Sequence, residues 1–273
     1  MRLTEPIRNA EDPDFSNFVN AIGDGAGPSI PLNGLRIVYT AQDLIDFVYP
    51  SHILLHPHHC LQRAILAPTN AQVDMYNDAI LRAFSGDTRT YLAADSLKEV
   101  DDAGLVPPDS VLDYVEKNTP PGLPKHGLTI KKGGVYRLLR NLSLDRGLVK
   151  NIRVVVTNTG SRLITVKLLH SLDTIGGADE EILIPRITFS TELSSGYTLL
   201  RRQFPLAIAY ATTFNSCQGL TLDVIGIELT QSVFSHGQLY TTLSRIRNRN
   251  DVAIRLRAGE MSTENVTFQE ILV

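Results

Sequence analysis

The sequence predicts an α/β protein whose parallel sheet, flanked by helices, is interrupted by a small antiparallel β-barrel. Residues 64–84 combine a short apolar strand, a break and an amphipathic helix, the unit from which α/β folds are built. The continuous apolar run 204–211 is typical of a strand buried in a parallel sheet. Between them, residues 128–187 contain short β-branched strands separated by glycine turns, which favours a barrel inserted into the α/β pattern.

The N-terminal part of the chain supplies the first strands and helices of this sheet. Residues 1–34 are polar and rich in turns, and we predict a loop at 23–28 because no Lys-Ser/Thr follows its glycines. Thr40 is the predicted N-cap of the helix after it. The predicted elements are a strand at 35–39, a helix at 41–48, a strand at 64–67, an amphipathic helix at 71–84 and a strand at 91–93.

The rest of the chain forms the insertion and then returns to the sheet. Residues 101–127 are rich in Pro, Gly and Asp, which indicates a domain boundary. The predicted later elements are barrel strands at 135–139, 152–156 and 163–168, sheet strands at 204–211, 224–227 and 252–256, and a short helix at 237–245. We therefore expect four segments. Residues 1–60 form a lead-in and the start of the main domain, and 61–118 form the first part of that domain. Residues 119–190 form the insertion, and 191–273 form the second part of the main domain.

Composition excludes several classes of protein. The chain has 273 residues, 43% of them hydrophobic, which is enough for a sizeable core. Its longest apolar runs fall well short of the ~18 residues of a membrane span, so we expect no membrane association. The start of the chain has no apolar signal-peptide core. Two cysteines, Cys60 and Cys217, cannot form a disulfide framework, so a reducing compartment, cytoplasm or nucleus, is expected.

The positive charge is concentrated in one fifty-residue block. Residues 121–170 carry ten basic residues and one acidic residue, whereas residues 1–120 carry eight basic and 17 acidic residues. Residues 171–273 carry eight basic and 11 acidic residues. Such a block can bind a polyanion. A solvated β-rich surface that is basic without a ligand is the alternative interpretation.

A polar loop follows the apolar run 204–211. Residues 212–223 gather hydroxyl and amide side chains around Gly219. Ligands of α/β proteins bind at the carboxyl ends of strands, Gln218 offers both donors and acceptors, and a glycine lets another group approach its backbone. These residues suit contact with a phosphate, a sugar or a nucleotide. A Ser/Thr-rich connector without a ligand remains the other interpretation.

A second candidate site lies at the end of the predicted helix 237–245. Leu239, Leu243 and Ile246 line one helical face, and Arg245 falls at the helix end. An arginine there can cap the helix carbonyls. It can also reach a transferring phosphoryl group, as arginine fingers do. The spacing leaves both interpretations open.

Metal binding and covalent catalysis are not favoured. The histidine-rich segment 52–60 has no second His/Cys cluster to complete a four-ligand site, and no His is indicated near Cys217 to activate it as a nucleophile. The chain contains no Gly-Lys dipeptide and hence no Walker A loop. The acidic run 179–181 follows a glycine turn instead of an apolar strand, which makes it a poor magnesium site. We expect no metal ligands in this chain.

From Leu3 to about Leu256 the chain resembles the C-terminal half of the Pif-family DNA helicases, most closely the helicase part of Helitron transposon proteins. The order and spacing of several short segments carry this resemblance. The matching segments are 1–3, 64–70 with Asn77, 123–148, 202–205, 218–222, and 237–240 with 243–245.

The resemblance implies a second RecA-like domain that carries a small β-barrel insertion, the 2B subdomain. It also implies ATP-driven, 5′-to-3′ unwinding of DNA in the nucleus, with roles in DNA repair, recombination and telomere maintenance. ATP and Mg²⁺ are the cofactors that it implies for the intact helicase, with the metal ligands outside this chain.

Residue roles follow from the resemblance position by position. Arg2 matches an arginine that reaches the ATP phosphates, and Arg245 matches the arginine finger of the last helicase motif. Gln218 and Gly219 match the motif that couples nucleotide to single-stranded DNA. The implied contacts with single-stranded DNA are Pro68, Thr69, Asn70, Thr213, Asn215, Ser216, Lys131 and Lys132.

Two departures from the family pattern leave three hypotheses open. Ser216 stands where the family usually has Lys, and the first RecA-like domain, with its Walker A and magnesium-binding motifs, is missing. The chain is then expected to be a fragment, such as a truncated transposon remnant. It is either a helicase half-module that needs a first domain as its partner, a non-enzymatic module that binds single-stranded DNA, or a degenerate remnant.

Overall fold

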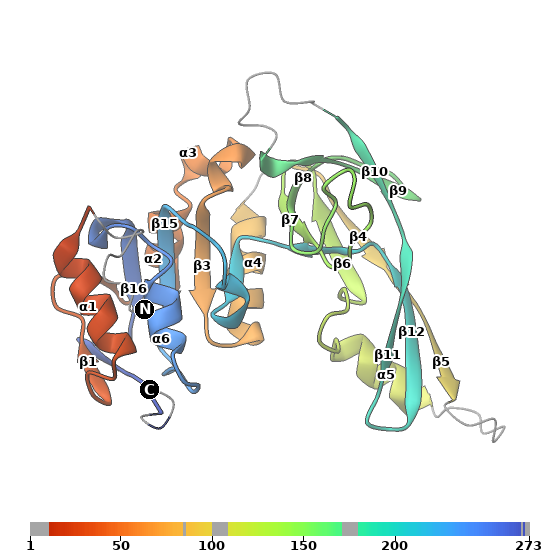
Figure 1. Cartoon of the computed structure of the whole chain (residues 1–273). Helices are drawn as coiled ribbons and strands as arrows, with labels where there is room; N and C mark the ends of the chain where they lie inside the picture. Colours follow the sequence, from red (N-terminus) through yellow and green to blue (C-terminus); the bar gives the residue numbers. More distant parts are fainter. Residues whose placement is uncertain (1–10, 84–85, 100–108, 171–179, 269, 271–273) are drawn as a thin grey trace. The chain divides into compact units, whose positions relative to one another are not determined.

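The chain folds into two compact units (Figure 1). The computed structural model describes residues 11–83, 86–99, 109–170, 180–268 and 270. The outer unit is built from Met1–Ala83 and Tyr210–Val273, and the inserted unit is Phe84–Ala209. The predicted insertion, 119–190, lies inside the inserted unit, which starts earlier and ends later. Among the described helices, none has the length and apolar character needed to cross a membrane.

A five-stranded parallel sheet forms the centre of the outer unit. Its strand order is β14-β3-β15-β16-β2, and all four neighbouring pairs are parallel. A separate two-stranded antiparallel ribbon joins β1 to β17. The bounds are β1 (Ser29–Pro31), β2 (Arg36–Val38), β3 (Arg63–Ala67), β14 (Ala211–Thr213), β15 (Val224–Glu228), β16 (Val252–Arg255) and β17 (Ser262–Glu264).

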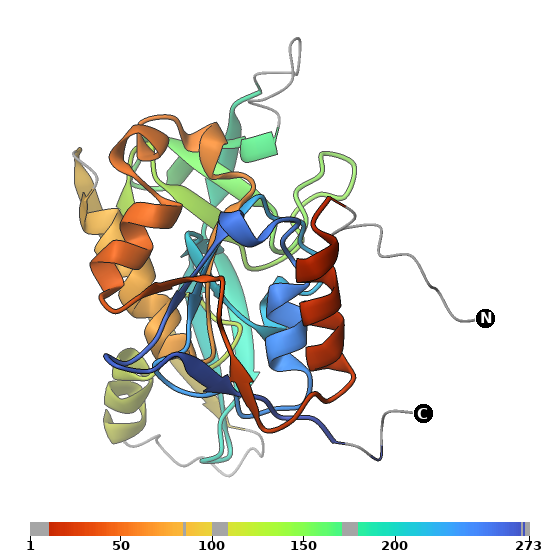
Figure 2. The ribbon, with the colours of Figure 1, turned by 90° about the vertical axis from the view of Figure 1, so that its left-hand side faces the viewer.

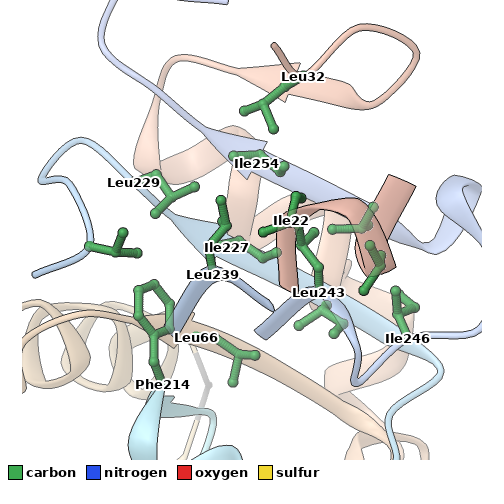
Figure 3. Close-up of a cluster of buried hydrophobic side chains, with 14 of the residues drawn as sticks. Ile22, Leu32, Leu66, Phe214, Ile227, Leu229, Leu239, Leu243, Ile246 and Ile254 are labelled. Carbon is green, nitrogen blue, oxygen red and sulfur yellow. The ribbon is translucent and has the colours of Figure 1, made fainter. Parts of the chain in front are cut away.

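Helices cover both faces of this sheet. On one face α1 packs beside α6 (Figure 2), and Ile22 of α1 and Leu239 and Leu243 of α6 meet Ile227 of β15 in one apolar cluster (Figure 3). On the other face α2 and α4 contact the strands. The helices are α1 (Pro13–Gly23), α2 (Ala41–Val48), α3 (Ser51–Leu54), α4 (Asn70–Ala83) and α6 (Gln238–Leu243), with 3-10 turns η1 (Pro57–Cys60), η3 (Asn215–Cys217) and η4 (Arg249–Asp251).

Close packing of α2 on the sheet depends on a glycine. A Cβ atom at Gly226 of β15 would lie 2.8 Å from a methyl carbon of Val48 and 2.9 Å from Leu44 Cγ. Contacts that short do not occur between real carbon atoms, so only glycine lets α2 approach β15 this closely.

Side-chain caps explain where two helices of the outer unit begin. Thr40 Oγ1 accepts a hydrogen bond from the backbone N–H of Asp43 at 3.1 Å, so the predicted N-cap of α2 is confirmed. Asp12 caps α1 by accepting from the N–H of Phe15 at 3.1 Å, and Pro13 occupies the first helical position. Both carboxylate oxygens of Asp12 also accept from the guanidinium of Arg249, at 2.6 and 2.9 Å.

The inserted unit is antiparallel, as the sequence predicts. Its strands form a five-stranded sheet in the order β10-β9-β8-β7-β13, a three-stranded sheet β11-β12-β5 and a pair β4-β6. The bounds are β4 (Thr88–Leu92), β5 (Ala94–Glu99), α5 (Asp109–Lys117), β6 (Gly127–Lys131), β7 (Val135–Leu138), β8 (Arg153–Thr159), β9 (Leu163–Leu168), β10 (Ile182–Pro185), β11 (Ile187–Glu192), β12 (Tyr197–Gln203) and β13 (Leu206–Ile208).

A buried arginine holds three segments of the inserted unit together. The side chain of Arg201 is fully buried and donates to Asp95 Oδ2 at 2.7 Å, to the carbonyl of Val115 at 2.8 Å and to that of Pro124 at 3.1 Å. His126 Nδ1 lies 2.9 Å from the same oxygen of Asp95. Burial raises the pKa of Asp95, but the hydrogen bonds from Arg201 and His126 outweigh it and leave the pKa below its usual value.

The prediction of one continuous parallel strand at 204–211 is wrong. The run contains two short strands that belong to different units: β13 pairs antiparallel with β7, and β14 pairs parallel with β3. Both strands are apolar because both are buried, and apolar content alone does not mark the change of unit between Ala209 and Tyr210.

Two helical or extended segments were not expected. Residues 1–34 were described as polar and rich in turns, with no helix or strand predicted, yet 13–23 form α1 and 29–31 form β1. The segment 101–127 was predicted as a boundary, yet 109–117 form α5. Both helices are short and carry apolar residues at helical spacing, such as Phe15, Val19 and Ile22 of α1, so this signal was overlooked among the turn-forming neighbours.

Candidate functional site

Two loops expected to contact DNA lie side by side at the carboxyl edge of the outer unit's sheet. Pro68, Thr69 and Asn70 follow β3, and the residues from 213 to 216 follow β14, its parallel neighbour. The N–H of Phe214 donates to the carbonyl of Ala67 at 3.1 Å, which joins the two loops at their base. The structure therefore brings together the six predicted contacts of the outer unit.

Hydroxyl groups fix the shape of both loops. Thr69 Oγ1 accepts from the N–H of Gln72 at 3.3 Å and caps α4. The hydroxyl of Thr213 donates to Ser216 Oγ at 2.9 Å and accepts from the N–H of Ser216 at 3.3 Å. Asn70 and Ser216 are exposed, whereas Pro68 is buried and shapes the turn.

A buried amide from α4 positions β14. Asn77 Oδ1 accepts from the N–H groups of Tyr210 and Ala211 at 2.9 and 2.8 Å, and its Nδ2 donates to the carbonyl of Ala211 at 3.3 Å. We did not predict this role. An amide on the apolar face of an amphipathic helix is the signal that marks such a residue, because buried polar groups need partners.

A second buried amide supports the loop after β14. Gln238, at the start of α6, accepts from the N–H groups of Phe234 and Ser235 at 3.1 and 3.2 Å. Its Nε2 donates to Asn215 Oδ1 at 3.4 Å. The N-terminal end of α6 therefore lies beside the predicted DNA-contacting loop. This residue was also missed as a site residue, because its exposure cannot be read from the sequence.

The other end of α6 lies beside the segment that carries Gln218 and Gly219. The N–H of Leu222 donates to the carbonyl of Arg245 at 3.3 Å. Gln218 and Gly219 are exposed, and Gly219 has a positive φ of 84°, which favours glycine. The segment that carries Gln218 and Gly219 is therefore joined by a backbone hydrogen bond to the helix end that carries Arg245.

The guanidinium of Arg245 is half-buried and keeps part of its donor capacity. Its Nε donates to the carbonyl of Thr241 at 3.0 Å, and its Nη2 donates to Ser244 Oγ at 3.0 Å. The helix-capping interpretation is therefore confirmed for one nitrogen. Among the described residues, no carboxylate pairs with this guanidinium, and its Nη1 makes no hydrogen bond.

Arg245 also acts on Cys217. Burial raises the pKa of the Cys217 thiol to about 11, although the positive charge of Arg245 opposes the shift. The thiol donates to the carbonyl of Phe214 at 3.0 Å. At neutral pH the thiol is protonated, so it is not an activated nucleophile.

The donors at this end of α6 fit a phosphate ligand. An uncompensated guanidinium, an exposed amide at Gln218 and an accessible backbone at Gly219 are groups that bind phosphate oxygens. Within the described parts of the chain, no group of three or more His, Cys, Asp or Glu residues is arranged to hold a metal ion. Arg2, the other predicted phosphate contact, lies outside the described residues.

Lys131 and Lys132 belong to the inserted unit and differ in exposure. Lys131 ends β6 and is only 9% exposed, whereas Lys132 is exposed. Of these two predicted DNA contacts, Lys132 is therefore the one that is open to solvent.

Other polar features of the outer unit do not coincide with these residues. A cavity of about 560 Å³ is lined by residues of the β1-β17 ribbon together with Arg257 and Glu260, and by none of the predicted site residues. Glu228, at the end of β15, is fully buried and bonded to Tyr76, Thr230 and Arg255. The Glu228 carboxylate is fully paired in this network, which favours a structural role, although the buried Nε of Arg255 has no hydrogen-bond partner among the described residues.

Comparison with known proteins finds Pif1 DNA helicases as relatives of the chain. No family model matches the chain. The chain is 31% identical over 206 residues to the ATP-dependent DNA helicase PIF1 of Danio rerio, a match that covers 72% of this chain and 29% of the relative. The chain is homologous to the Pif1 DNA helicases. The human PIF1 helicase is 36% identical over 124 residues, which are 44% of this chain and 18% of that protein. The chain therefore spans less than a third of these Pif1 relatives.

Solved Pif1 structures share the fold. The Pif1 helicase from Candida albicans matches 92% of this chain and 55% of its own with a TM-score of 0.63 and 21% identity. The Bacteroides Pif1 bound to single-stranded DNA matches 93% of this chain and 51% of its own with a TM-score of 0.61 and 22% identity. The outer unit is therefore RecA-like α/β, and the expectation of a RecA-like sheet with an antiparallel insertion is confirmed.

Proposed function

We propose that the chain is the second motor segment of a Pif-type, ATP-dependent DNA helicase that moves 5′ to 3′ along single-stranded DNA. Its partners are single-stranded DNA and a first RecA-like domain that carries the phosphate loop and the magnesium ligands. Arg245 serves as the arginine finger in this proposal, and Gln218 and Gly219 contact the nucleotide.

The arrangement of α6 is the observation that carries the proposal. One end of this six-residue helix reaches Asn215 through Gln238, and the other end places Arg245 beside the Gln218 segment. A short rigid helix that touches both a DNA-contacting loop and a phosphate-contacting arginine transmits a shift at one end to the other. Coupling of this kind is what a DNA-stimulated motor requires.

The chemistry assigned to this chain is electrostatic. ATP, bound with Mg²⁺ on the first domain, supplies the phosphoryl group that is transferred to water. Arg245 stabilises negative charge on that group, and its remaining bonds to Thr241 and Ser244 hold the guanidinium in place. Gln218 orients the ATP phosphates, and the backbone at Gly219, which has no side chain, leaves room for them.

A module that binds single-stranded DNA without hydrolysis is the second candidate. The exposed cations of the inserted unit, among them Lys132, Arg140 and Lys150, favour it. An inactive Helitron-derived remnant is favoured instead by Ser216, which lacks the charge of the lysine that the family usually has at that position.

Two measurements on the full chain test the proposal. Binding of a fluorescently labelled oligo-dT at several salt concentrations should show salt-sensitive affinity. ATP hydrolysis with saturating oligo-dT should be absent, because the first domain supplies the phosphate loop. Turnover by the pure chain that Arg245→Ala abolishes would contradict the half-module, and absence of any binding would remove the DNA partner.

The cellular part of the proposal rests on the resemblance to the family. A nuclear location and roles in DNA repair, recombination and telomere maintenance are proposed on that basis. Imaging of the tagged protein in its own cells tests the compartment, and a purely cytoplasmic signal contradicts it.

A further inference from the structure

Two arginines from distant parts of the inserted unit face the same aromatic ring. The guanidinium carbon of Arg89, on β4, lies 5.1 Å from the centre of the Tyr91 ring. That of Arg186, just after β10, lies 5.8 Å from the same centre and 5.1 Å from the centre of the Phe204 ring. These cation–π contacts hold both side chains in place.

A tight turn brings a third arginine to this position. The hydroxyl of Tyr91 donates to the carbonyl of Gly160 at 2.7 Å, and Nη1 of Arg89 donates to that of Thr159 at 3.3 Å. The turn between β8 and β9 therefore lies against β4, and it carries the exposed Arg162. The next residue, Leu163, pairs with Pro185, which directly precedes Arg186.

Glycine is needed for this turn. The N–H of Gly160 donates to the carbonyl oxygen of Leu163 at 3.0 Å, and a Cβ atom at Gly160 would lie 2.6 Å from that oxygen. The turn is therefore closed by the backbone, and its shape sets where Arg162 projects. We call Arg89, Arg162 and Arg186 the arginine cluster.

The positive charge of the arginine cluster is not neutralised by the described residues. Arg89 and Arg186 donate only to the backbone carbonyls of Thr159 and Leu92, and Arg162 makes no ion pair with a described carboxylate. Like charges held together repel one another, so an arrangement of this kind favours an anion. Guanidinium groups match phosphate oxygens in geometry as well as charge.

We propose that the arginine cluster binds backbone phosphates of single-stranded DNA. The proposal rests on the proposed function. It adds Arg89 and Arg186, which lie outside the basic block 121–170, to Arg162, which lies within that block. The exposed Lys132 follows β6, the strand that pairs with the one carrying Arg89, and extends the same surface. An open row of cations on several strands suits successive phosphates of a chain better than one small phosphate.

Salt-dependent binding of labelled oligo-dT to the full chain tests the proposal. Arg162→Gln and the double variant Arg89→Gln/Arg162→Gln are compared with Arg146→Gln, an exposed arginine of the same unit that already pairs with Glu180 at 2.6 Å. Arg162→Gln should retain the thermal unfolding of the parent chain, because Arg162 makes no ion pair with a described carboxylate.

Each lost phosphate contact should weaken binding several-fold at low salt and reduce the slope of log K against log salt by about 0.7. The control should match the parent. Binding by the parent with no change in either cluster variant overturns the arginine cluster and leaves the proposed function standing. Absence of binding by the parent overturns the DNA partner itself.

Competition with inorganic pyrophosphate distinguishes a site for a DNA strand from a site for a small anion. At the same total phosphate concentration it should displace little of the oligo-dT. Full displacement, lost in the double variant, would assign the cluster to a small phosphate compound and overturn the proposal.

Discussion

The backbone N–H of Leu222 donates to the carbonyl of Arg245, so the segment after Gln218 is tied directly to the end of α6. The positive charge of Arg245 also acts on Cys217, which directly precedes Gln218, although Cys217 and Arg245 lie 28 positions apart in the sequence. The sequence left open whether Arg245 caps the helix or contacts a phosphate. In the structure its Nε donates to the helix carbonyl of Thr241, and its Nη1 is left to contact a phosphate.

Loss of the Arg245 guanidinium should remove hydrolysis without unfolding the chain. In a fusion of this chain to the first motor segment of a Pif1 helicase, Arg245→Ala should lower kcat for ATP by about 10³-fold or more. Arg247→Ala, a change at an exposed arginine two residues on, is the control and should leave kcat within a few-fold. Equal rates for the parent fusion and Arg245→Ala, or no hydrolysis by the parent fusion, count against the half-module.

Removal of Arg201 should destabilise the inserted unit strongly. Arg201→Ala leaves the buried Asp95 carboxylate with His126 as its remaining partner and frees the carbonyls of Val115 and Pro124, which should cost about 3–5 kcal/mol. Arg202→Ala, at the exposed neighbouring position on β12, should cost about 0.5 kcal/mol or less. Urea unfolding measures both. Equal effects of the two changes would show that the buried network adds nothing.

The contact between Asp12 and Arg249 should make the outer unit sensitive to acid. The hydrogen bond from Arg249 holds the pKa of Asp12 well below its usual value, despite the opposing effect of burial. A lowered carboxyl pKa contributes stability that is complete above the unfolded value, about 4, and is lost as pH falls towards the folded value.

Unfolding free energies between pH 7 and pH 3 measure this contribution. The parent chain should lose more stability over that range than Asp12→Asn, which has no proton to bind at this position. A parallel fall in the two proteins would be inconsistent with a lowered pKa at Asp12.

Filling the space at Gly226 should separate α2 from the sheet. Gly226→Ala places a carbon within 2.9 Å of Val48 and Leu44, and overpacking of this kind costs about 1–3 kcal/mol. Gly127→Ala, at a strand glycine with nothing within 4 Å of its Cβ position, is the matched control and should be nearly neutral. Thermal unfolding distinguishes them, and a neutral Gly226→Ala would mean that α2 can shift freely.

Local patterns predicted most of the outer unit because they reflect local causes. The strand at 64–67, the helix at 71–84 and the helix at 41–48 with its cap at Thr40 each follow from apolar spacing and capping. The run 204–211 was mispredicted because burial makes β13 and β14 equally apolar, and the change of unit depends on partners far away in the sequence.

The site divides in the same way. The loop after β14 was predicted from the rule that ligands of α/β proteins bind at the carboxyl ends of strands. The loop after β3 was assigned only from the resemblance to the family. The supporting roles of Asn77 and Gln238 were not predicted, since a buried amide differs from an exposed one only in its tertiary partners. The arginine cluster was hidden for the same reason, because Arg89 and Arg186 lie 97 positions apart in the chain.

The strand order β14-β3-β15-β16-β2 has a consequence for biosynthesis. In that sheet β2 and β3 pair only with strands that begin at residue 211 or later. Both strands therefore stay unpaired in that sheet while the ribosome translates the whole inserted unit. Nascent chains stalled before that point would present open strand edges to one another. The sheet is therefore completed only after the inserted unit has been translated. The need for chaperones should be greatest during that translation.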